Sequence, residues 1–307
     1  MTLAILLSGQ GGQHPGMFDL TADLPEAQGV FAAAAALLGA DPRALARAGG
    51  SALHDNRTGQ ILCCVAGLAG WQVVAAARPE RAIVAGYSIG DLAAWGVAGR
   101  FGPDTVLRLA AARAEAMDAA SGDGFGLAGI RGLGFDALAA LAERHGCHLA
   151  IRNAADSGVV GGARDALDAL CREATGLGAQ RAVVLPVHTP SHTPLLDAAA
   201  ARFRGILAGA ETHRPAAGAP RLVSGLDGAP VFDAAAGREK LALQIARTID
   251  WAACLDACRE YGADRVIELG PGHALATMAE AALPGARVHA LEAFRSRDGV
   301  RAWIGRP

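Results

Sequence analysis

Short apolar runs alternate along the chain with longer segments of helical periodicity. Residues 2–7 and 81–85 are almost wholly apolar, which is typical of strands buried on both faces of a parallel sheet. Residues 266–269 predict a further strand. Helices are predicted at 20–38, 54–77, 103–120, 195–208, 240–247 and 251–261, and one more begins at 273. This alternation predicts an α/β fold with a mostly parallel sheet.

Residues 125–188 follow a different order. Strands are predicted at 126–130, 148–154, 158–162 and 181–187, with helices at 135–145 and 163–175. This βαββαβ order is the ferredoxin-like plan. We therefore predict a small ferredoxin-like lobe at 125–188, inserted in a large α/β-hydrolase-like lobe made of 1–124 and 189–307. In the large lobe, residues 221–232 predict a hairpin that turns at Asp227 and Gly228.

Composition and charge narrow the class of protein. Of the 307 residues, 52% are hydrophobic and 19% are charged, so the chain can bury a large core. A formal net charge of −2 gives no reason to expect nucleic acid or an anionic membrane as a partner. The six cysteines contain no C-x-x-C pair, which favours buried thiols in a reducing compartment over disulfides or a metal site.

The N-terminal residues lack the basic region of a signal peptide. The longest apolar run, 61–77, is interrupted by Gln72 and is rich in alanine and glycine, which favours a buried helix over a membrane span. We therefore expect a cytoplasmic protein.

The sequence G-Y-S-I-G at residues 86–90 lies between a predicted strand and a predicted helix. A serine on such a turn is a nucleophile elbow, in which the two glycines allow strand and helix to approach closely. The hydroxyl of Ser88 is then exposed, and backbone N–H groups at the start of the helix can face a developing oxyanion. The pattern predicts nucleophilic catalysis by Ser88.

A glycine-rich loop, G-Q-G-G-Q at residues 9–13, follows the first predicted strand. The dinucleotide-binding pattern fails because His14 stands where its third glycine is required, and a phosphate loop fails because Lys240 is the only lysine. An N–H group offered to a reacting carbonyl is one use of such a loop.

Nine histidines are available as a base for the serine. His188 and His192 differ from the others because they lie in a proline-punctuated loop where the chain returns to the large lobe, and loops on a rigid scaffold often carry catalytic groups. Spacing does not choose between the two.

Five motifs occur in the order found in malonyl-CoA:acyl-carrier-protein transacylases, a family that the chain resembles over nearly its whole length. They are the loop at 9–13, the elbow at 86–90, Arg113, P-S-H at 190–192 and G-P-G at 270–272. The predicted inserted lobe is also similar to the one in that family. From its residue type and helix alone, Arg113 would be a solvated side chain; the register of the motifs favours a functional one.

The resemblance implies a set of roles for individual residues. Ser88 is the implied nucleophile and His192 the implied base, with His188 as a neighbouring substrate-binding residue. The backbone N–H groups of Gln10 and Ile89 are the implied oxyanion hole.

The resemblance also implies a substrate and an acceptor. Arg113 would pair with the free carboxylate of a malonyl group, and a backbone carbonyl, here that of Gln244, would orient the histidine in place of an aspartate. The implied reaction moves malonyl from malonyl-CoA to the thiol of an acyl carrier protein with a phosphopantetheine-type arm. No bound cofactor and no metal are expected.

Two positions depart from the usual elbow of this family, which has histidine before the serine and glutamate after the second glycine. Tyr87 and Asp91 stand there instead. The tyrosine elbow and H-T-P-S-H at 188–192 most resemble the malonyltransferase (epsilon) subunit of bacterial malonate decarboxylase, which implies other subunits of that enzyme as partners. A malonyl transacylase of fatty-acid or polyketide synthesis is the alternative.

A serine hydrolase or thioesterase is a third interpretation, of a different class. It would require an acidic triad member between the serine and the histidine. Asp123, Asp156 and Asp165 lie in that interval but belong to the region of the predicted inserted lobe, which argues against the hydrolase order.

Overall fold

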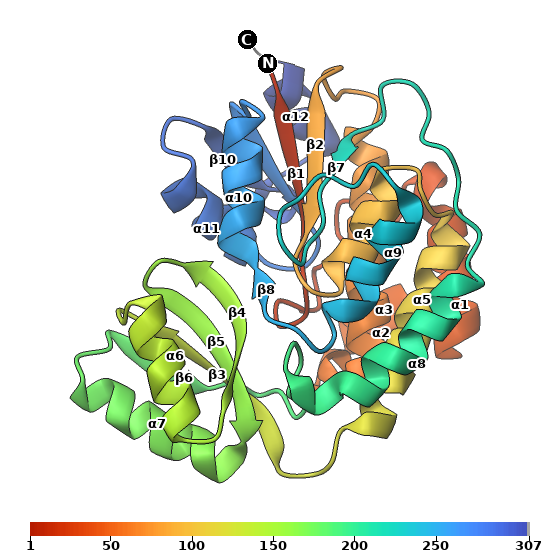
Figure 1. The fold of residues 1–307 in the computed structure, drawn as a ribbon. Helices are drawn as coiled ribbons and strands as arrows, with labels where there is room; N and C mark the ends of the chain where they lie inside the picture. Colours follow the sequence, from red (N-terminus) through yellow and green to blue (C-terminus); the bar gives the residue numbers. More distant parts are fainter. Residues whose placement is uncertain (306–307) are drawn as a thin grey trace.

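A five-stranded parallel sheet lies at the centre of the larger part of the computed structural model, which describes residues 1–305 (Figure 1). The strand order is β10 (Arg287–Ala290), β9 (Arg265–Leu269), β1 (Leu3–Leu7), β2 (Ala82–Gly86) and β7 (Arg221–Leu222). Every neighbouring pair is parallel. The parallel sheet predicted from the apolar runs is confirmed.

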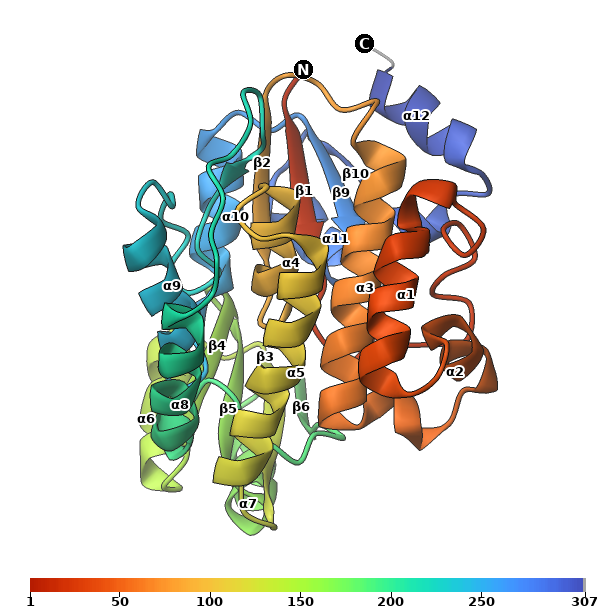
Figure 2. The same cartoon turned by 90° about the vertical axis from the view of Figure 1, so that its right-hand side faces the viewer.

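The pleat of β1 explains why this strand is apolar at every position. Leu3, Ile5 and Leu7 belong to a core cluster formed mainly with helices, while Ala4 and Leu6 belong to a second cluster on the opposite face. The first face is covered by α3 (Asn56–Val74), α4 (Gly90–Val97) and α5 (Pro103–Ala120), and the second by α10 (Trp251–Glu260) and α11 (Ala274–Ala282). Figure 2 shows α1 (Gln28–Leu38) and α8 (Asp197–Ala208) packed outside α3 and α5.

The second sheet lies beside the carboxyl ends of the parallel strands (Figure 1). Its order is β6 (Arg181–Val184), β3 (Phe125–Arg131), β5 (Ser157–Ala163), β4 (His148–Ala154) and β8 (Ile249–Asp250). Two helices, α6 (Phe135–Arg144) and α7 (Arg164–Gly176), pack on one face and enclose a separate apolar core. The βαββαβ order expected for this region is present, so the mixed α/β architecture is confirmed.

β8 comes from outside the predicted range 125–188. It pairs in parallel with β4, whereas the other strands of this sheet pair antiparallel. The boundaries of the two lobes at 1–124, 125–188 and 189–307 stay predictions.

Three predicted elements differ most in the structure, and the strand predicted at 181–187 also ends early, at Val184. The helix expected at 20–38 begins only at Gln28, because Pro25 keeps Leu24 extended and a short 3-10 turn, Pro25–Ala27, comes first. The helix expected at 240–247 is instead α9 (Ala234–Leu243), which Asp233 caps by accepting a bond from the backbone N–H of Ala236 at 2.7 Å.

The third difference is the hairpin expected at 221–232. The chain does turn back at Gly228, which has a φ of 69°, but the two arms share only an isolated bridge between Val223 and Pro230. The first arm is β7, which joins the parallel sheet at the edge of β2. Two helices have no counterpart in the predictions, α2 (Pro42–Ala48) and α12 (Arg297–Gly305).

Across residues 1–305, no single helix combines the length and apolar composition that crossing a membrane requires. The bent pair of segments Pro25–Leu38 and Pro42–Ala48, 73° apart, meets that requirement only when the two are joined.

Candidate active site

Ser88 lies on a sharp turn between β2 and α4, at the carboxyl edge of the parallel sheet. Its φ is 56°, in the left-handed region that residues with a side chain rarely adopt. The flanking glycines leave no room for a side chain: a Cβ on Gly86 would lie 2.2 Å from the backbone N of Asp91, and one on Gly90 would lie 2.2 Å from the carbonyl oxygen of Leu7. The G-x-S-x-G spacing thus corresponds to a real close approach of strand, turn and helix.

His192 faces this serine from a loop remote in the sequence. Its Nε2 lies 2.8 Å from Ser88 Oγ, and its backbone N–H donates to the carbonyl of Ile245 at 2.8 Å. On the other side of the ring, Nδ1 hydrogen-bonds the carbonyl oxygen of Gln244. His192 has a φ of 65°, and among residues 1–305 it and Ser88 are the only residues other than glycine with positive φ.

These contacts determine the protonation of the ring. A carbonyl oxygen can only accept, so Nδ1 carries the hydrogen and Nε2 is left as the acceptor for the hydroxyl of Ser88. Burial, with a further contribution from the nearby Arg113 guanidinium, lowers the pKa of His192 to about 3. The imidazole is therefore neutral at physiological pH, which is the form that can take a proton.

The two backbone amides expected to form an oxyanion hole belong to the elbow itself and to the loop that packs against it. Within residues 1–305, the N–H groups of Gln10 and Ile89 donate to no other group of the chain. The loop that carries Gln10 is held against the elbow because Gly9 has no side chain: a Cβ there would lie 2.9 Å from the carbonyl oxygen of Tyr87. Free amides at such a place can stabilise an oxyanion.

Arg113 is buried, not solvated. Its side chain is 1% exposed, on the face of α5 that packs against α3, where its Nη1 donates to Gln60 Oε1 at 2.7 Å. Nη2 lies 3.5 Å from Ser88 Oγ. Burial lowers the pKa of Arg113 to about 10, so the guanidinium still carries its charge at neutral pH. No carboxylate of residues 1–305 forms an ion pair with it.

The structure separates the two histidines that spacing left open. His188 is exposed, and its Nδ1 lies 3.1 Å from Nη2 of Arg164 on α7. Asp123, Asp156 and Asp165, the acidic residues that a hydrolase would need, are exposed as well, and the ring of His192 has a carbonyl partner instead.

Three side chains that contact the site were missed by sequence reasoning. Gln60, fully buried on α3, positions Arg113. Asn153 on β4 accepts a hydrogen bond from the hydroxyl of Tyr87 at 3.1 Å and so links the elbow to the second sheet. Asp91, which the sequence singled out as a departure from the family's usual elbow and not as a site residue, is 1% exposed and bonded to the segment that follows α9. A buried polar residue in an apolar helix, as Gln60 is, was the available signal.

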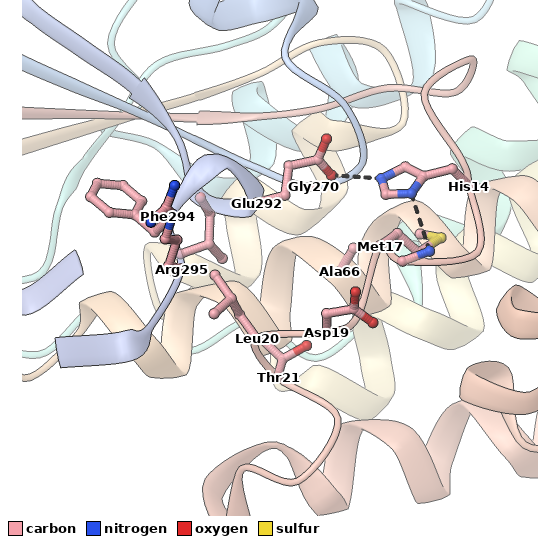
Figure 3. A pocket seen from close by; sticks show the side chains of 12 residues that line it. His14, Met17, Asp19, Leu20, Thr21, Ala66, Gly270, Glu292, Phe294 and Arg295 are labelled. Atoms are coloured by element: carbon pink, nitrogen blue, oxygen red, sulfur yellow. Dashed lines mark hydrogen bonds and ion pairs between the residues drawn. The ribbon is translucent and has the colours of Figure 1, made fainter. Parts of the chain in front are cut away.

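A pocket of about 370 Å³ lies apart from these residues (Figure 3). There His14 Nε2 lies 2.9 Å from Glu292 Oε2, and His14 Nδ1 accepts from the backbone N–H of Gly16 at 3.1 Å. None of Ser88, His192 or Arg113 lines it. Among residues 1–305, no three histidine, cysteine, aspartate or glutamate side chains are grouped as a metal site would require.

Comparison with known proteins decides the family. The malonyl CoA-acyl carrier protein transacylase of Mycobacterium tuberculosis is 32% identical over 308 residues, covering 96% of this chain and 98% of its own. The chain belongs to the malonyl-CoA:acyl-carrier-protein transacylase family. Its members are acyltransferases, and the transacylase of Salmonella typhimurium is another relative, 30% identical over 89% of this chain and 90% of its own.

Solved transacylase structures share the whole fold. The crystal structure of an acyl-carrier-protein S-malonyltransferase from Burkholderia pseudomallei is 30% identical, with a TM-score of 0.90, and covers 98% of this chain and 99% of its own. The transacylase from M. tuberculosis has a TM-score of 0.88 at 28% identity, with full coverage of both chains. No family model matches the chain. The transacylase fold therefore extends over both sheets.

Proposed function

We propose that this protein transfers a malonyl group from malonyl-CoA to the thiol of an acyl carrier protein through a malonyl-Ser88 intermediate. The observation that carries the proposal is the 2.8 Å contact between Ser88 Oγ and the neutral Nε2 of His192. The amide of Ile89, next to Ser88 in the chain, and that of Gln10, in the adjoining loop, have no acceptor among residues 1–305. The named relatives are malonyl CoA-acyl carrier protein transacylases, which supports the substrate and the acceptor.

The proposed reaction has two matching halves. Ser88 Oγ attacks the thioester carbonyl while His192 Nε2 takes the hydroxyl proton, and the N–H groups of Gln10 and Ile89 bind the oxyanion. Collapse breaks the C–S bond, and His192 returns the proton to the departing thiolate of CoA. The carrier thiol then attacks the serine ester, gives its proton to His192, and Ser88 regains a proton as it leaves. In each half His192 takes one proton and returns it, so the reaction requires no cofactor besides its substrates.

Arg113 is proposed to select the malonyl group. A terminal carboxylate that enters an apolar site unpaired is costly, so the site requires a fixed cation. The guanidinium is buried, charged and directed at Ser88 by Gln60, with its Nε still without a partner among residues 1–305. A planar fork suits a carboxylate better than an ammonium does. His188, which contacts Arg164 at the surface, is proposed to act only on the outer part of the substrate.

The carbonyl partner of His192 weighs against the hydrolase interpretation. Hydrolases of the α/β class orient the base with a carboxylate, and here the carbonyl of Gln244 takes that place. Water must also be kept from the acyl-serine long enough for the carrier thiol to arrive.

Mass spectrometry of the intact protein tests the proposed intermediate. Brief exposure to malonyl-CoA should add one malonyl group per chain, and Ser88→Ala should add none. Labelling that persists in Ser88→Ala would overturn the assignment of the nucleophile, and wild-type protein that releases free malonate without a carrier would favour the hydrolase.

The finer proposal is that the carrier belongs to malonate decarboxylase. It is supported by Tyr87 in place of the usual elbow histidine and by H-T-P-S-H at 188–192. Tyr87 is also tied to the second sheet through Asn153, and its ring packs edge-on against Trp251 with 5.3 Å between centroids. The elbow is thus shaped by residues around the tyrosine.

Two carriers separate this proposal from its alternative. Malonyl-loaded wild-type protein is mixed with the carrier subunit of malonate decarboxylase or with a fatty-acid-synthesis carrier, and the rate of malonyl loss from Ser88 is followed. Faster transfer to the decarboxylase carrier is expected. Preference for the fatty-acid carrier would assign the protein to fatty-acid or polyketide synthesis and leave the transacylase chemistry intact.

A further inference from the structure

Asp91 follows Ser88 by three residues, and among residues 1–305 its side chain hydrogen-bonds neither Ser88 nor His192. Its side chain, on the first turn of α4, is 1% exposed. The carboxylate oxygen Oδ2 accepts two hydrogen bonds, from the backbone N–H of Gly225 and from Nε2 of Gln244, both at 3.0 Å. An interaction with the helix dipole alone does not require this burial or these two bonds.

Gln244 is the residue whose backbone carbonyl receives the Nδ1 hydrogen of His192. It immediately follows α9, so no helical hydrogen bond fixes the orientation of its own carbonyl. Its side chain is 1% exposed, and the carboxylate of Asp91 defines which end of its amide is the donor, since Nε2 must face the acceptor. Asp91 therefore holds the side chain of Gln244, and His192 hydrogen-bonds its backbone carbonyl.

We infer that Asp91 is a positioning residue: it holds the side chain of Gln244 so that the Gln244 carbonyl keeps His192 in line with Ser88. Asp91 follows Ser88 on the same elbow, so the nucleophile and the segment that orients its base are fixed to a single helix turn. The inference rests on the proposed function because it assigns His192 the role of base.

Asp91 can accept the hydrogen bonds from Gly225 and Gln244 whether its carboxyl group is ionised or protonated. Both hydrogen bonds go to Oδ2, while Oδ1 has no partner among residues 1–305. Burial raises the pKa of Asp91 to about 7, and a proton on Oδ1 would leave both bonds to Oδ2 intact. An asparagine whose amide oxygen occupies the place of Oδ2 would preserve them too. Gly225 permits the approach, since a Cβ there would lie 2.9 Å from Oδ2.

A double-mutant cycle on acylation tests the inference. Asp91→Ala and Gln244→Met each remove the side-chain contact, and Gln244→Met keeps the backbone carbonyl. Each should lower the maximal rate of single-turnover acylation by malonyl-CoA roughly tenfold. The concentration of malonyl-CoA that gives half of this rate should be unchanged, because a displaced base affects only the transition state. The double variant should be little slower than either single one, since both break the same contact. Asp91→Asn should retain nearly wild-type rates.

Gln72→Met is the matched control, since Gln72 lies on α3 away from the site, and it should acylate normally. Wild-type rates in Asp91→Ala and Gln244→Met would overturn the inference, and so would a double variant whose loss is the product of the two single losses.

A nuclear magnetic resonance signal separates positioning from a general loss of structure. The Nδ1 proton of His192, held by the Gln244 carbonyl, should give a downfield resonance in the wild type. It should move in Asp91→Ala and Gln244→Met and return to its wild-type position in Asp91→Asn. An unmoved resonance in variants that are slow would assign Asp91 a purely structural role. If wild-type protein forms no malonyl-Ser88, the proposed function fails, while this signal still reports whether Asp91 orients the ring.

Discussion

The turn that carries Ser88 is closed by hydrogen bonds between near neighbours in the chain, whereas the loop around His192 is hydrogen-bonded to a distant segment. In the elbow, the backbone N–H of Gly90 donates to Tyr87 and that of Asp91 donates to Ser88. In the histidine loop, both the backbone and the ring of His192 are bound to residues 244–245, beyond α8, β7 and α9. Each region holds a residue at positive φ, which costs about 1–3 kcal/mol.

This difference shows why one half of the site is encoded by a short motif and the other is not. Gly86 has no room for a side chain because it faces the backbone of Asp91 in the same turn, and Gly90 has none because α4 lies against Leu7 of β1. The G-x-S-x-G pattern therefore carries a structural reason that can be recognised in five residues. Nothing within the loop at 188–192 distinguishes one histidine from the other. The distinction comes from a carbonyl of the 244–245 segment that the loop meets only after folding.

Replacement of each of the two histidines by alanine gives the largest expected effect on the rate of acylation. His192→Ala should slow acylation of Ser88 by about 10²- to 10⁴-fold, the usual loss for a general base. His188→Ala should cost far less, because its ring lies at the surface against Arg164. Single-turnover mass spectrometry with malonyl-CoA measures both. The opposite ranking would mean that the remote segment does not define the base.

Substitutions of Arg113, whose guanidinium lies beside Ser88, test which residue selects malonyl over acetyl groups. Arg113→Ala should cost malonyl transfer about 3–5 kcal/mol, as for an uncompensated buried charge. Acetyl transfer should be unchanged or improved. Arg113→Lys should recover part of the loss, because the planar fork is missing. The readout is the malonyl-to-acetyl ratio of kcat/KM. Equal losses for both substrates would make Arg113 a structural support of Ser88.

Gly90→Ala tests whether the elbow requires the close approach of α4 to β1. The new methyl group would meet the carbonyl of Leu7, so we expect a loss of about 1–3 kcal/mol in the free energy of unfolding, as overpacking typically costs. Gly205→Ala is the control: it lies exposed inside α8 with open space around it and should gain about 0.5–1 kcal/mol. Urea titrations compare the two. A neutral Gly90→Ala would show that the turn tolerates rearrangement.

The smallest expected effect is on the pH profile of acylation, which tests whether the ring of His192 is buried and neutral. A histidine of ordinary pKa would be about nine-tenths protonated at one pH unit below it, and acylation would fall about tenfold by pH 5.5. Burial lowers the pKa of His192 to about 3, so its basic form persists and the rate should change less than about twofold between pH 8 and 5.5.

The profile is repeated in Asp91→Asn, because burial raises the pKa of Asp91 to about 7. The lowered pKa of His192 also makes the stability of the protein depend on pH. Its folded pKa lies below the unfolded one, so its contribution to stability is complete above pH 6.5 and declines as the pH falls toward 3. In the pH profile, a fall of about tenfold in the rate of acylation between pH 8 and 5.5 in both proteins would show that the ring is solvated.

Sequence reasoning predicted the mixed α/β architecture, and it named Ser88, His192 and Arg113, which the structure brings together. Its failures have physical causes. The buried strands and the elbow were readable because their apolar pattern and glycine spacing are local. The role of Gln60 was not, because it depends on how α3 and α5 pack. Arg113 was readable only through its register with other motifs, since a helical arginine is ordinarily solvated. Pro25 was the overlooked signal that delays α1 to Gln28.

The two-residue strand β8 has a consequence for anyone who recombines this protein with a relative. Its neighbour Thr248 donates to the carbonyl of Leu149 at 2.7 Å, and its Asp250 forms an ion pair of 3.1 Å with Arg152. A chimera that exchanges only residues 125–188 would pair a foreign β4 with the host's β8. Because that strand continues from the segment that hydrogen-bonds His192, a mismatched edge would reach the histidine. Crossover points that transfer residues 244–250 together with the βαββαβ unit avoid this conflict.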